Sequence, residues 1–332
     1  MLMRKLGRTG YSVTALGLGC YQLTGQFGVS PQLADSIIDT AYKLGINYLD
    51  TAQQYGAGES EAIIGRALTA HPDWRPYISD KCGHFDYTIS RFHGEESYTD
   101  PEEIIRSIKH SLWLLRLDHI HILMLHEHNS PLWKFNYETG SCIGMEVLRQ
   151  LKREGVTEYI GIGGWDCHLA AKLVSRAEID VVLMAGGINL LSRPMFDEFI
   201  PEAVKHNVGV IVGGAFGQNN KYLIRKDRSG VEELRNSDDL KQAVMAEKLT
   251  KLYDLSDELG TSMTELAVRY VLSFNEIHCH VAGAREAEHL LSNSAAVDKG
   301  SLSPDVMEQI DRIQNIGESP TPLDVALQSK KQ

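Results

Sequence analysis

The sequence lacks the features that are typical of membrane-spanning and secreted proteins. No apolar run reaches 18 residues, which argues against a transmembrane helix, and segment 1–13 has no signal-peptide core. The cysteines are odd in number and include no Cys-x-x-Cys pair: Cys20, Cys82, Cys142, Cys167 and Cys279. We therefore expect free thiols and a reducing, cytoplasmic location.

Positive charge is also scarce. Lys and Arg number 33 against 44 Asp and Glu, so the net charge is −11, and no long basic stripe is present. Nucleic acids and anionic membranes are therefore not expected as partners. With only 10 prolines and a hydrophobic fraction of 43%, the 332 residues are expected to form a globular protein of one large domain or two ordinary ones.

What the sequence does contain is a regular alternation of two patterns. Eight short apolar runs have the length and composition of strands: 15–19, 46–50, 77–81, 120–126, 159–163, 181–185, 208–213 and 277–283. Between most of them lie stretches with helical periodicity: 31–44, 101–117, 146–154, 169–177, 197–206, 243–259 and 263–274. This alternation predicts parallel strands that are joined by crossover helices.

Eight such units favour a closed (β/α)8 TIM barrel of the α/β class over an open doubly wound sheet. The dinucleotide-binding form of the open sheet requires Gly-x-Gly-x-x-Gly after the first strand, whereas 16–23 reads Leu-Gly-Leu-Gly-Cys-Tyr-Gln-Leu. Gly7 and Gly10 predict the turn of an N-terminal hairpin that plugs the bottom of the barrel. We expect a single domain, 1–332, with a hairpin at 3–14, a barrel at about 15–298, and a C-terminal helix and tail at 303–332.

Three connections that follow predicted strands are unusually long: 82–99, 127–140 and 215–238. In a barrel, the carboxyl ends of the strands form the active-site face. Aromatic residues in these connections predict the walls of a small-molecule pocket, and the alternative is that they only pack the loops down: Phe85, Tyr87, Phe92, Tyr98, Trp133, Phe135, Tyr137, Phe216 and Tyr222.

Four residues with acid–base chemistry are predicted at the same face. Asp50 and Tyr55 follow the second strand, Lys81 ends the third and His126 ends the fourth. A lysine ammonium lowers the pKa of a nearby tyrosine, an aspartate keeps the lysine charged, and a histidine donates a hydrogen bond to a substrate oxygen. Together they predict a proton donor for an oxygen that becomes an alkoxide, as carbonyl reduction requires, and a cofactor must supply the hydride.

Each of these residues also has a structural alternative. Asp50 suits a helix cap or a turn, Lys81 suits a solvated position, and His126 suits a buried polar side chain. Their joint placement is what favours catalysis.

The segment Asp50-Thr-Ala-x-x-Tyr55-Gly-x-Gly-Glu59 resembles the signature of the aldo-keto reductase superfamily. The resemblance covers roughly residues 3–315. It implies a (β/α)8 barrel, hydride transfer with nicotinamide, and a catalytic tetrad in which Tyr55 is the general acid/base: Asp50, Tyr55, Lys81 and His126. The glycine-rich strand ends resemble the branch of D-threo-aldose, L-galactose and pyridoxal dehydrogenases, which implies a sugar-like or small carbonyl substrate.

The strand ends where this family holds the nicotinamide differ from its usual pattern. Gly163-Gly164 stands in place of Ser-Asn, Ala185 in place of a Gln, and 213–217 (Gly-Gly-Ala-Phe-Gly) in place of Tyr-Ser-Pro-Leu. The resemblance therefore implies cofactor-binding residues that offer mainly backbone: Gly163, Gly164, Ala185, Gly213, Gly214, Phe216 and Gly217. Lost cofactor binding is the alternative, and the intact tetrad favours retention.

The segment 283–293 resembles the family's phosphate-binding end, and its implied cofactor-binding residues are Gly283, Arg285, His289 and Asn293. Glu286 and Glu288 flank the single arginine and would repel a 2′-phosphate. Because Arg285 can also pair with a phosphate, the cofactor is NAD or NADP, with NAD or dual use favoured.

These features predict an NAD(P)-dependent oxidoreductase that interconverts an aldehyde or hemiacetal and its alcohol or lactone. A non-redox isomerase or lyase, and a non-catalytic cofactor-sensing subunit, remain as alternatives. The pattern His126-x-His128, near His84 and His93, has the look of a metal site, but its strand is predicted to end at His126, so no metal is expected. The sequence contains no pattern that identifies the substrate, the direction of the reaction or the oligomeric state.

Overall fold

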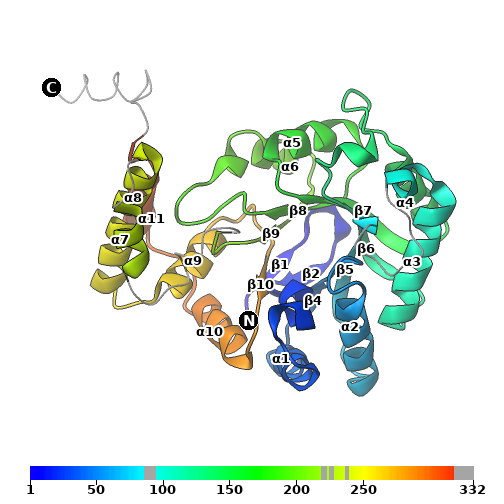
Figure 1. Cartoon of the computed structure of the whole chain (residues 1–332), viewed down its shortest axis with the longest axis horizontal. Coiled ribbons are helices and arrows are strands. Elements are labelled where there is room, and N and C mark those ends of the chain that lie inside the picture. Colours follow the sequence, from blue (N-terminus) through cyan, green and yellow to red (C-terminus); the bar gives the residue numbers. More distant parts are fainter. Residues whose placement is uncertain (86–94, 218–222, 224–227, 236–238, 318–332) are drawn as a thin grey trace.

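The computed structural model describes residues 1–85, 95–217, 223, 228–235 and 239–317 (Figure 1). Eight parallel strands close into a barrel in the order β10-β3-β4-β5-β6-β7-β8-β9, which confirms the predicted (β/α)8 architecture. These strands are β3 (Leu16–Gly19), β4 (Tyr48–Asp50), β5 (Tyr77–Cys82), β6 (Ile120–His126), β7 (Thr157–Gly164), β8 (Val181–Ala185), β9 (Gly209–Gly213) and β10 (Cys279–Gly283).

Helices surround the barrel, and Figure 1 shows α7, α8 and α11 gathered at one side of it. The helices are α1 (Pro31–Lys43), α2 (Glu59–Ala70), α3 (Pro101–Leu115), α4 (Ile143–Arg153), α5 (Cys167–Arg176), α6 (Phe199–Lys205), α7 (Ser229–Arg235), α8 (Leu240–Glu258), α9 (Met263–Leu272), α10 (Ala287–Asp298) and α11 (Pro304–Gln314). None of the helices in the described residues is long and apolar enough to span a membrane.

The helix boundaries follow local signals where a capping side chain exists. Asp100 accepts hydrogen bonds from the backbone N–H groups of Glu102 and Glu103 and so starts α3, and Gly155 follows α4 with a φ of 77°. Three helices, α2, α7 and α10, were not predicted. Neither Gly58 before α2 nor Glu286 before α10 makes a side-chain cap hydrogen bond, so these starts carry no capping signal.

The predicted N-terminal hairpin is confirmed and closes the bottom of the barrel. Its strands β1 (Met3–Lys5) and β2 (Ser12–Thr14) pair antiparallel, with Met3 opposite Thr14. Leu6 and Val13 are fully buried and belong to a core of side chains inside the barrel: Tyr48, Ile122, Met124, Val181, Leu183, Ile211, Cys279 and Val281. The hairpin therefore supplies the apolar floor, and a separate core fills the space between strands and helices.

Parallel pairing brings the carboxyl ends of all eight strands to one face. Asp50, Lys81 and His126 lie at the ends of β4, β5 and β6, three consecutive neighbours in the barrel. Their side chains therefore meet although up to 76 residues of sequence separate them. All five cysteines are unpaired, as predicted.

Candidate active site

Three of the four predicted acid–base residues form a direct hydrogen-bonded chain. Lys81 donates from Nζ to Asp50 Oδ2 at 2.8 Å, to the Thr51 carbonyl oxygen at 2.7 Å and to Tyr55 Oη at 3.2 Å. Ser79 holds the other Asp50 oxygen at 2.8 Å through its hydroxyl. All the donors of the ammonium are used, so its position beneath the Tyr55 hydroxyl is determined.

Lys81 is buried yet charged. Only 1% of the residue is exposed, and burial alone would lower the pKa of its ammonium. The charges and hydrogen bonds of Asp50 and Tyr55 outweigh that effect and raise the Lys81 pKa above its ordinary value. The structural alternative of a solvated lysine is therefore wrong, and the site holds a permanent positive charge.

The pKa of the Tyr55 hydroxyl differs from the prediction. Lys81 lowers the Tyr55 pKa, as expected, but burial has the larger effect and raises that pKa to about 12. Tyr55 is therefore a protonated phenol at neutral pH. The ammonium stabilises the phenolate that forms once the proton has been given away, rather than forming it in advance.

His126 completes the group. Its ring lies edge-on to the Tyr55 ring with the centroids 5.7 Å apart. Burial, followed by the charges of Lys81 and His84, holds the His126 pKa well below its ordinary value, so the imidazole is neutral. Its Nδ1 is buried and lacks a hydrogen-bond partner, so the tautomer with the proton on Nε2 is favoured, and this nitrogen can donate to a substrate oxygen.

The loops beside this group have an unusual backbone. Gly56, Ala57 and Gly58 are left-handed in succession directly after Tyr55, and His84 and Glu127 have φ values of 54° and 51° after β5 and β6. Left-handed non-glycine residues carry strain that the surrounding structure must hold. Here the strained turns set the direction of the side chains around Tyr55 and His126.

His84 and Glu127 contact each other at this rim. His84 Nε2 lies 3.3 Å from Glu127 Oε2, and the His84 ring lies 4.6 Å from the His126 ring. Polar side chains in the loops at this face suit a hydrophilic substrate. Three further polar residues of the same loop, Asp86, Arg91 and His93, lie outside the described residues.

Three of the aromatic residues that were expected to line a pocket pack against one another, which agrees with the alternative that they hold the loops in place. Phe85, Tyr98 and Trp133 are buried, with ring centroids 4.8 Å (Phe85–Tyr98) and 4.7 Å (Tyr98–Trp133) apart. Trp133 also donates from Nε1 to the His126 carbonyl oxygen at 2.9 Å. These rings hold the loops in place, whereas Tyr87, Phe92 and Tyr222 lie outside the described residues.

The structure explains why Gly163 and Gly164 carry no side chains. A Cβ on Gly163 would lie 3.1 Å from Lys81 Cδ, and one on Gly164 would lie 2.6 Å from His128 Nδ1. His128 is fully buried, and its Nε2 lies 3.0 Å from the Asp166 carbonyl oxygen, so the ring cannot easily move. Glycine at these strand ends is therefore a steric requirement of this chain.

The remaining predicted cofactor residues lie at the next strand ends of the same face. Ala185 ends β8 and Gly213 ends β9. Gly214 and Gly217 are left-handed, with φ values of 72° and 77°, and Phe216 lies between them, partly buried. This turn presents backbone groups and one aromatic ring to the rim.

The segment after β10 has the character of an anion site. Gly283 lies at the end of β10, Arg285 and His289 are exposed, and Asn293 is buried on α10. The first turn of α10 has no side-chain cap; its His289 N–H donates to the Glu286 carbonyl oxygen at 3.2 Å, and the N–H groups of Ala287 and Glu288 precede the helical hydrogen bonds. Arg285 lies over the Phe27 ring at 5.3 Å, beside the loop that follows β3. These features fit the phosphates of a dinucleotide.

Two aromatic residues at the rim were not predicted. Tyr21 follows β3, is 45% exposed, and has its ring centroid 4.8 Å from that of Tyr55. Trp165 follows β7 directly and is 55% exposed. Trp165 lies in the short connection between β7 and α5 and Tyr21 in the connection between β3 and α1, whereas the predicted pocket walls lie in three other, longer connections. An aromatic residue immediately after a strand end was the available signal.

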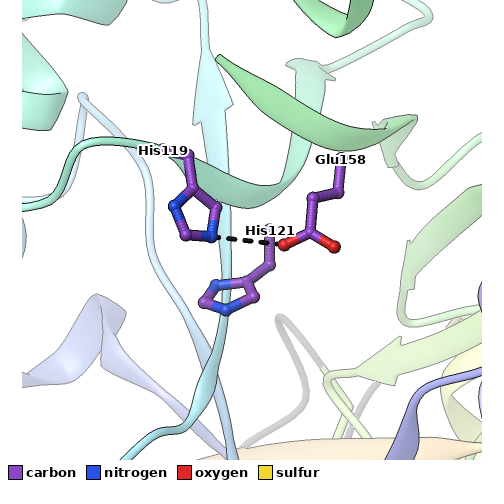
Figure 2. A group of neighbouring side chains, drawn as sticks. All are labelled: His119, His121 and Glu158. Carbon is purple, nitrogen blue, oxygen red and sulfur yellow. Dashed lines mark ion pairs between the residues drawn. The ribbon is translucent and has the colours of Figure 1, made fainter. Parts of the chain in front are cut away.

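Figure 2 shows the one group among the described residues whose side chains could hold a metal ion: His119, His121 and Glu158. It lies at the amino-terminal ends of β6 and β7, away from Tyr55. His119 pairs with Glu158 at 3.2 Å, and His121 Nδ1 accepts the Ile78 backbone N–H at 3.2 Å. The neutral His121 ring then carries its proton on Nε2, so neither nitrogen offers a free lone pair to a metal.

The comparisons with known proteins identify the family of the chain. The chain belongs to the aldo/keto reductase family, whose model matches residues 15–315. It is similar to the pyridoxal 4-dehydrogenase of Microbacterium luteolum (26% identity, covering 87% of this chain and 91% of that protein). It is also similar to the L-galactose dehydrogenase of Arabidopsis thaliana (28% identity, covering 89% and 88%).

The solved structure of an aldo-keto reductase from Bacillus halodurans, in a holo form, superimposes with a TM-score of 0.75 and 25% identity over 96% of this chain and 99% of that one. The protein is thus an enzyme of the aldo-keto reductase type, in a family that uses NAD(P)H. Pyridoxal and L-galactose dehydrogenases are two of the three enzymes named in the predicted branch, which is confirmed.

Proposed function

We propose that this enzyme transfers a hydride between a nicotinamide cofactor and a sugar-like hemiacetal or small aldehyde, giving the lactone or the alcohol. The observation that carries the proposal is the Tyr55 hydroxyl, 3.2 Å from a Lys81 ammonium that Asp50 holds at 2.8 Å. Such an arrangement has its purpose in moving a proton to or from a substrate oxygen.

The residues act together in the direction of reduction. Tyr55 gives its proton to the carbonyl oxygen as negative charge develops there, and Lys81 stabilises the resulting phenolate. His126, which is neutral, donates a hydrogen bond from Nε2 to the same oxygen and orients it. In the direction of oxidation the Tyr55 phenolate takes the hydroxyl proton back.

A nicotinamide cofactor, when bound, supplies or accepts the hydride at the substrate carbon. The residues proposed to hold it are those at the ends of β7 to β10 and at the start of α10: Gly163, Gly164, Ala185, Gly213, Gly214, Phe216, Gly217, Gly283, Arg285, His289 and Asn293. Glu286 and Glu288 flank Arg285, so we propose NAD or dual use rather than a strict preference for NADP.

A polar substrate fits the rim. His84 and Glu127, in contact with each other, lie next to His126 and offer donor and acceptor groups to substrate hydroxyls. Exposed Tyr21 and Trp165 provide flat apolar surfaces against which a sugar or pyridine ring can lie. This combination supports an aldose or pyridoxal-like substrate over a long aliphatic aldehyde.

The test is a screen of aldoses, pyridoxal and simple aldehydes and alcohols with NAD⁺, NADH, NADP⁺ and NADPH, followed at the nicotinamide absorbance band. Turnover of polar substrates with a change in that band is expected. Product formation without an absorbance change would show non-redox chemistry and contradict the proposal. NADPH binding about tenfold or more tighter than NADH binding would overturn the cofactor preference.

A further inference from the structure

Two buried carboxyl groups lie directly behind the active site. Glu61 on α2 is 1% exposed and Asp80 on β5 is fully buried. Side chains alternate along a strand, so Asp80 points away from the barrel interior that its neighbour Lys81 enters. The mechanism proposed above uses neither carboxyl group, and buried charged residues are costly unless they have a role or a partner.

Asp80 holds the backbone of Lys81. Its Oδ1 accepts the Lys81 backbone N–H at 2.8 Å. On the other side of the residue, the Gln53 backbone N–H donates to the Lys81 carbonyl oxygen at 3.2 Å. The side-chain amide of Gln53 in turn donates from Nε2 to the hydroxyls of Ser107 and Ser111 on α3, at 3.1 Å and 3.0 Å. The peptide groups of Lys81 are therefore tied to α3 and to the Asp80 carboxylate.

The two carboxyl groups meet at a position that requires a proton. They lie within hydrogen-bonding distance of each other, yet Asp80 Oδ2 and Glu61 Oε1 are both buried without a donor. Two carboxylates cannot donate to each other, whereas one shared proton satisfies both oxygens. Burial, together with the Asp80 charge, raises the Glu61 pKa well above its ordinary range, and burial raises the Asp80 pKa to about 6.

The surroundings favour the proton on Glu61. Lys81 and its backbone N–H stabilise the ionised form of Asp80, whereas Asp50 opposes it. Ser111 from α3 hydrogen-bonds Glu61 and favours its ionised form, but burial outweighs this effect. Leu123 of β6 is opposite Asp80 in the sheet, and the Cys82 thiol, whose pKa burial raises, stays neutral. The pair thus carries a single negative charge at neutral pH.

We propose that Glu61 and Asp80 share one proton and act as positioning residues that keep the Lys81 ammonium beneath the Tyr55 hydroxyl. This inference rests on the proposed function for its kinetic consequence, but the shared proton stands on its own. Acidification places a second proton on the pair, so Asp80 becomes a neutral acceptor and holds the Lys81 N–H less firmly. The proton comes from solvent and no other bond changes.

The first variant is Asp80→Asn, which imitates the doubly protonated pair in nearly the same shape. We expect kcat to fall about 5- to 10-fold because a charge-assisted hydrogen bond becomes a neutral one. The Kd of NADH and of NADPH should not change, because the pair lies behind the strand. The acid limb of the kcat profile near pH 6 should disappear.

Stability gives a readout that needs no substrate. The Asp80 pKa is raised on folding, so the folded state holds a proton that the unfolded chain has lost, and stability falls as pH rises from about 4 to about 6. Asp80→Asn removes this loss of stability at higher pH. Its Tm should therefore exceed that of the parent at pH 8, and the difference should shrink as pH falls through 6.

The second variant is Glu61→Gln, which keeps a donor to Asp80 and the single negative charge. We expect a kcat within about twofold of the parent and an acid limb at about the same pH, because the glutamine amide donates to the ionised Asp80 as the protonated Glu61 does. Glu178→Gln, an exposed substitution of the same type, is the control and should change neither kcat nor Tm.

The outcomes separate the two proposals. Parental kcat and an unchanged acid limb in Asp80→Asn would overturn the positioning role, and a lower Tm or failure to fold in that variant would overturn the shared proton. Loss of kcat in Glu61→Gln equal to that in Asp80→Asn would also contradict it. If the parent turned over no substrate, the proposed function would fail, but the Tm comparison would still show whether Glu61 and Asp80 share a proton.

Discussion

The two ends of the barrel differ in packing and in polarity. At the bottom, Leu6 and Val13 of the hairpin close an apolar core, and Gly7 approaches the start of β9 so closely that a Cβ would lie 2.3 Å from the Gly209 backbone nitrogen. At the top, the loops after β4, β5 and β6 contain left-handed Ala57, His84 and Glu127. The bottom is apolar and closely packed, and the top is polar.

Unpartnered polar atoms are not confined to one end. Among the described residues, His126 Nδ1, His128 Nδ1 and Asn129 Oδ1 are buried without partners at the top, with Asp80 Oδ2 and Glu61 Oε1 behind them, and the Tyr11 and Tyr48 hydroxyls are buried without partners at the bottom. Each such atom reduces stability, so the packed floor and the helices must offset them. Stability and chemistry are thus assigned to different ends of one barrel, as the fold permits.

The largest effect should come from the top. Tyr55→Phe removes the proton donor and should lower kcat about 1000-fold, with cofactor Kd and Tm unchanged. Steady-state kinetics and fluorescence titration of the cofactor check this. Activity near the parental value would show that Tyr55 is not the proton donor and would contradict the assignment of the chemistry to the top of the barrel.

Next in size is a change at the floor. Leu6→Ala should lower the free energy of unfolding by about 4 kcal/mol, because a fully buried side chain is replaced by a cavity that the rigid barrel cannot fill. Urea unfolding measures the change. The exposed control Val204→Ala should cost less than about 0.5 kcal/mol. A loss of kcat in Leu6→Ala at temperatures where it is folded would show that the two ends are not independent.

A third prediction concerns His280, which lies on the barrel wall and points outward to its helices. Burial lowers the His280 pKa to about 4, although the Val212 carbonyl oxygen opposes the shift. The unfolded chain binds a proton near pH 6.5, so stability is complete above that pH and falls by about 3 kcal/mol as pH drops towards 4. In His280→Asn the acid loss should be smaller by that amount, and an unchanged pH dependence would contradict the assignment.

The smallest effect on stability should come from the rim. Trp165→Ala truncates a side chain that is 55% exposed, so the free energy of unfolding should change by less than about 0.5 kcal/mol. KM for a ring-shaped substrate should nevertheless rise about fivefold, because a stacking surface is lost. An equal rise in KM for a small acyclic aldehyde would argue against stacking.

Much of this molecule could be predicted locally. The apolar run at 120–126 and the run at 181–185 match β6 and β8 residue for residue, and Asp100-Pro101 marks the start of α3. The predicted strand ends place Asp50, Lys81 and His126 at one face. These features depend on periodicity and on capping, which operate within a few residues of sequence.

Other features could not be read in that way. Glu61 and Asp80 are 19 positions apart and give no motif, and only the packing of α2 on β5 brings their carboxyl groups together. The same holds for His128, whose ring excludes a side chain at Gly164. Phe85, Tyr98 and Trp133 had the composition of pocket walls, and closure of the loops made them a buried support.

The sequence alone thus determined the barrel, the floor hairpin and the residue types at the active face, because each is encoded in local pattern and strand order. The tertiary structure decided the protonation states of the active-site residues. Lys81 does lower the Tyr55 pKa, yet the loss of water around the hydroxyl outweighs it, and desolvation is set by every element that encloses the site. Spacing along the chain carries no measure of that enclosure.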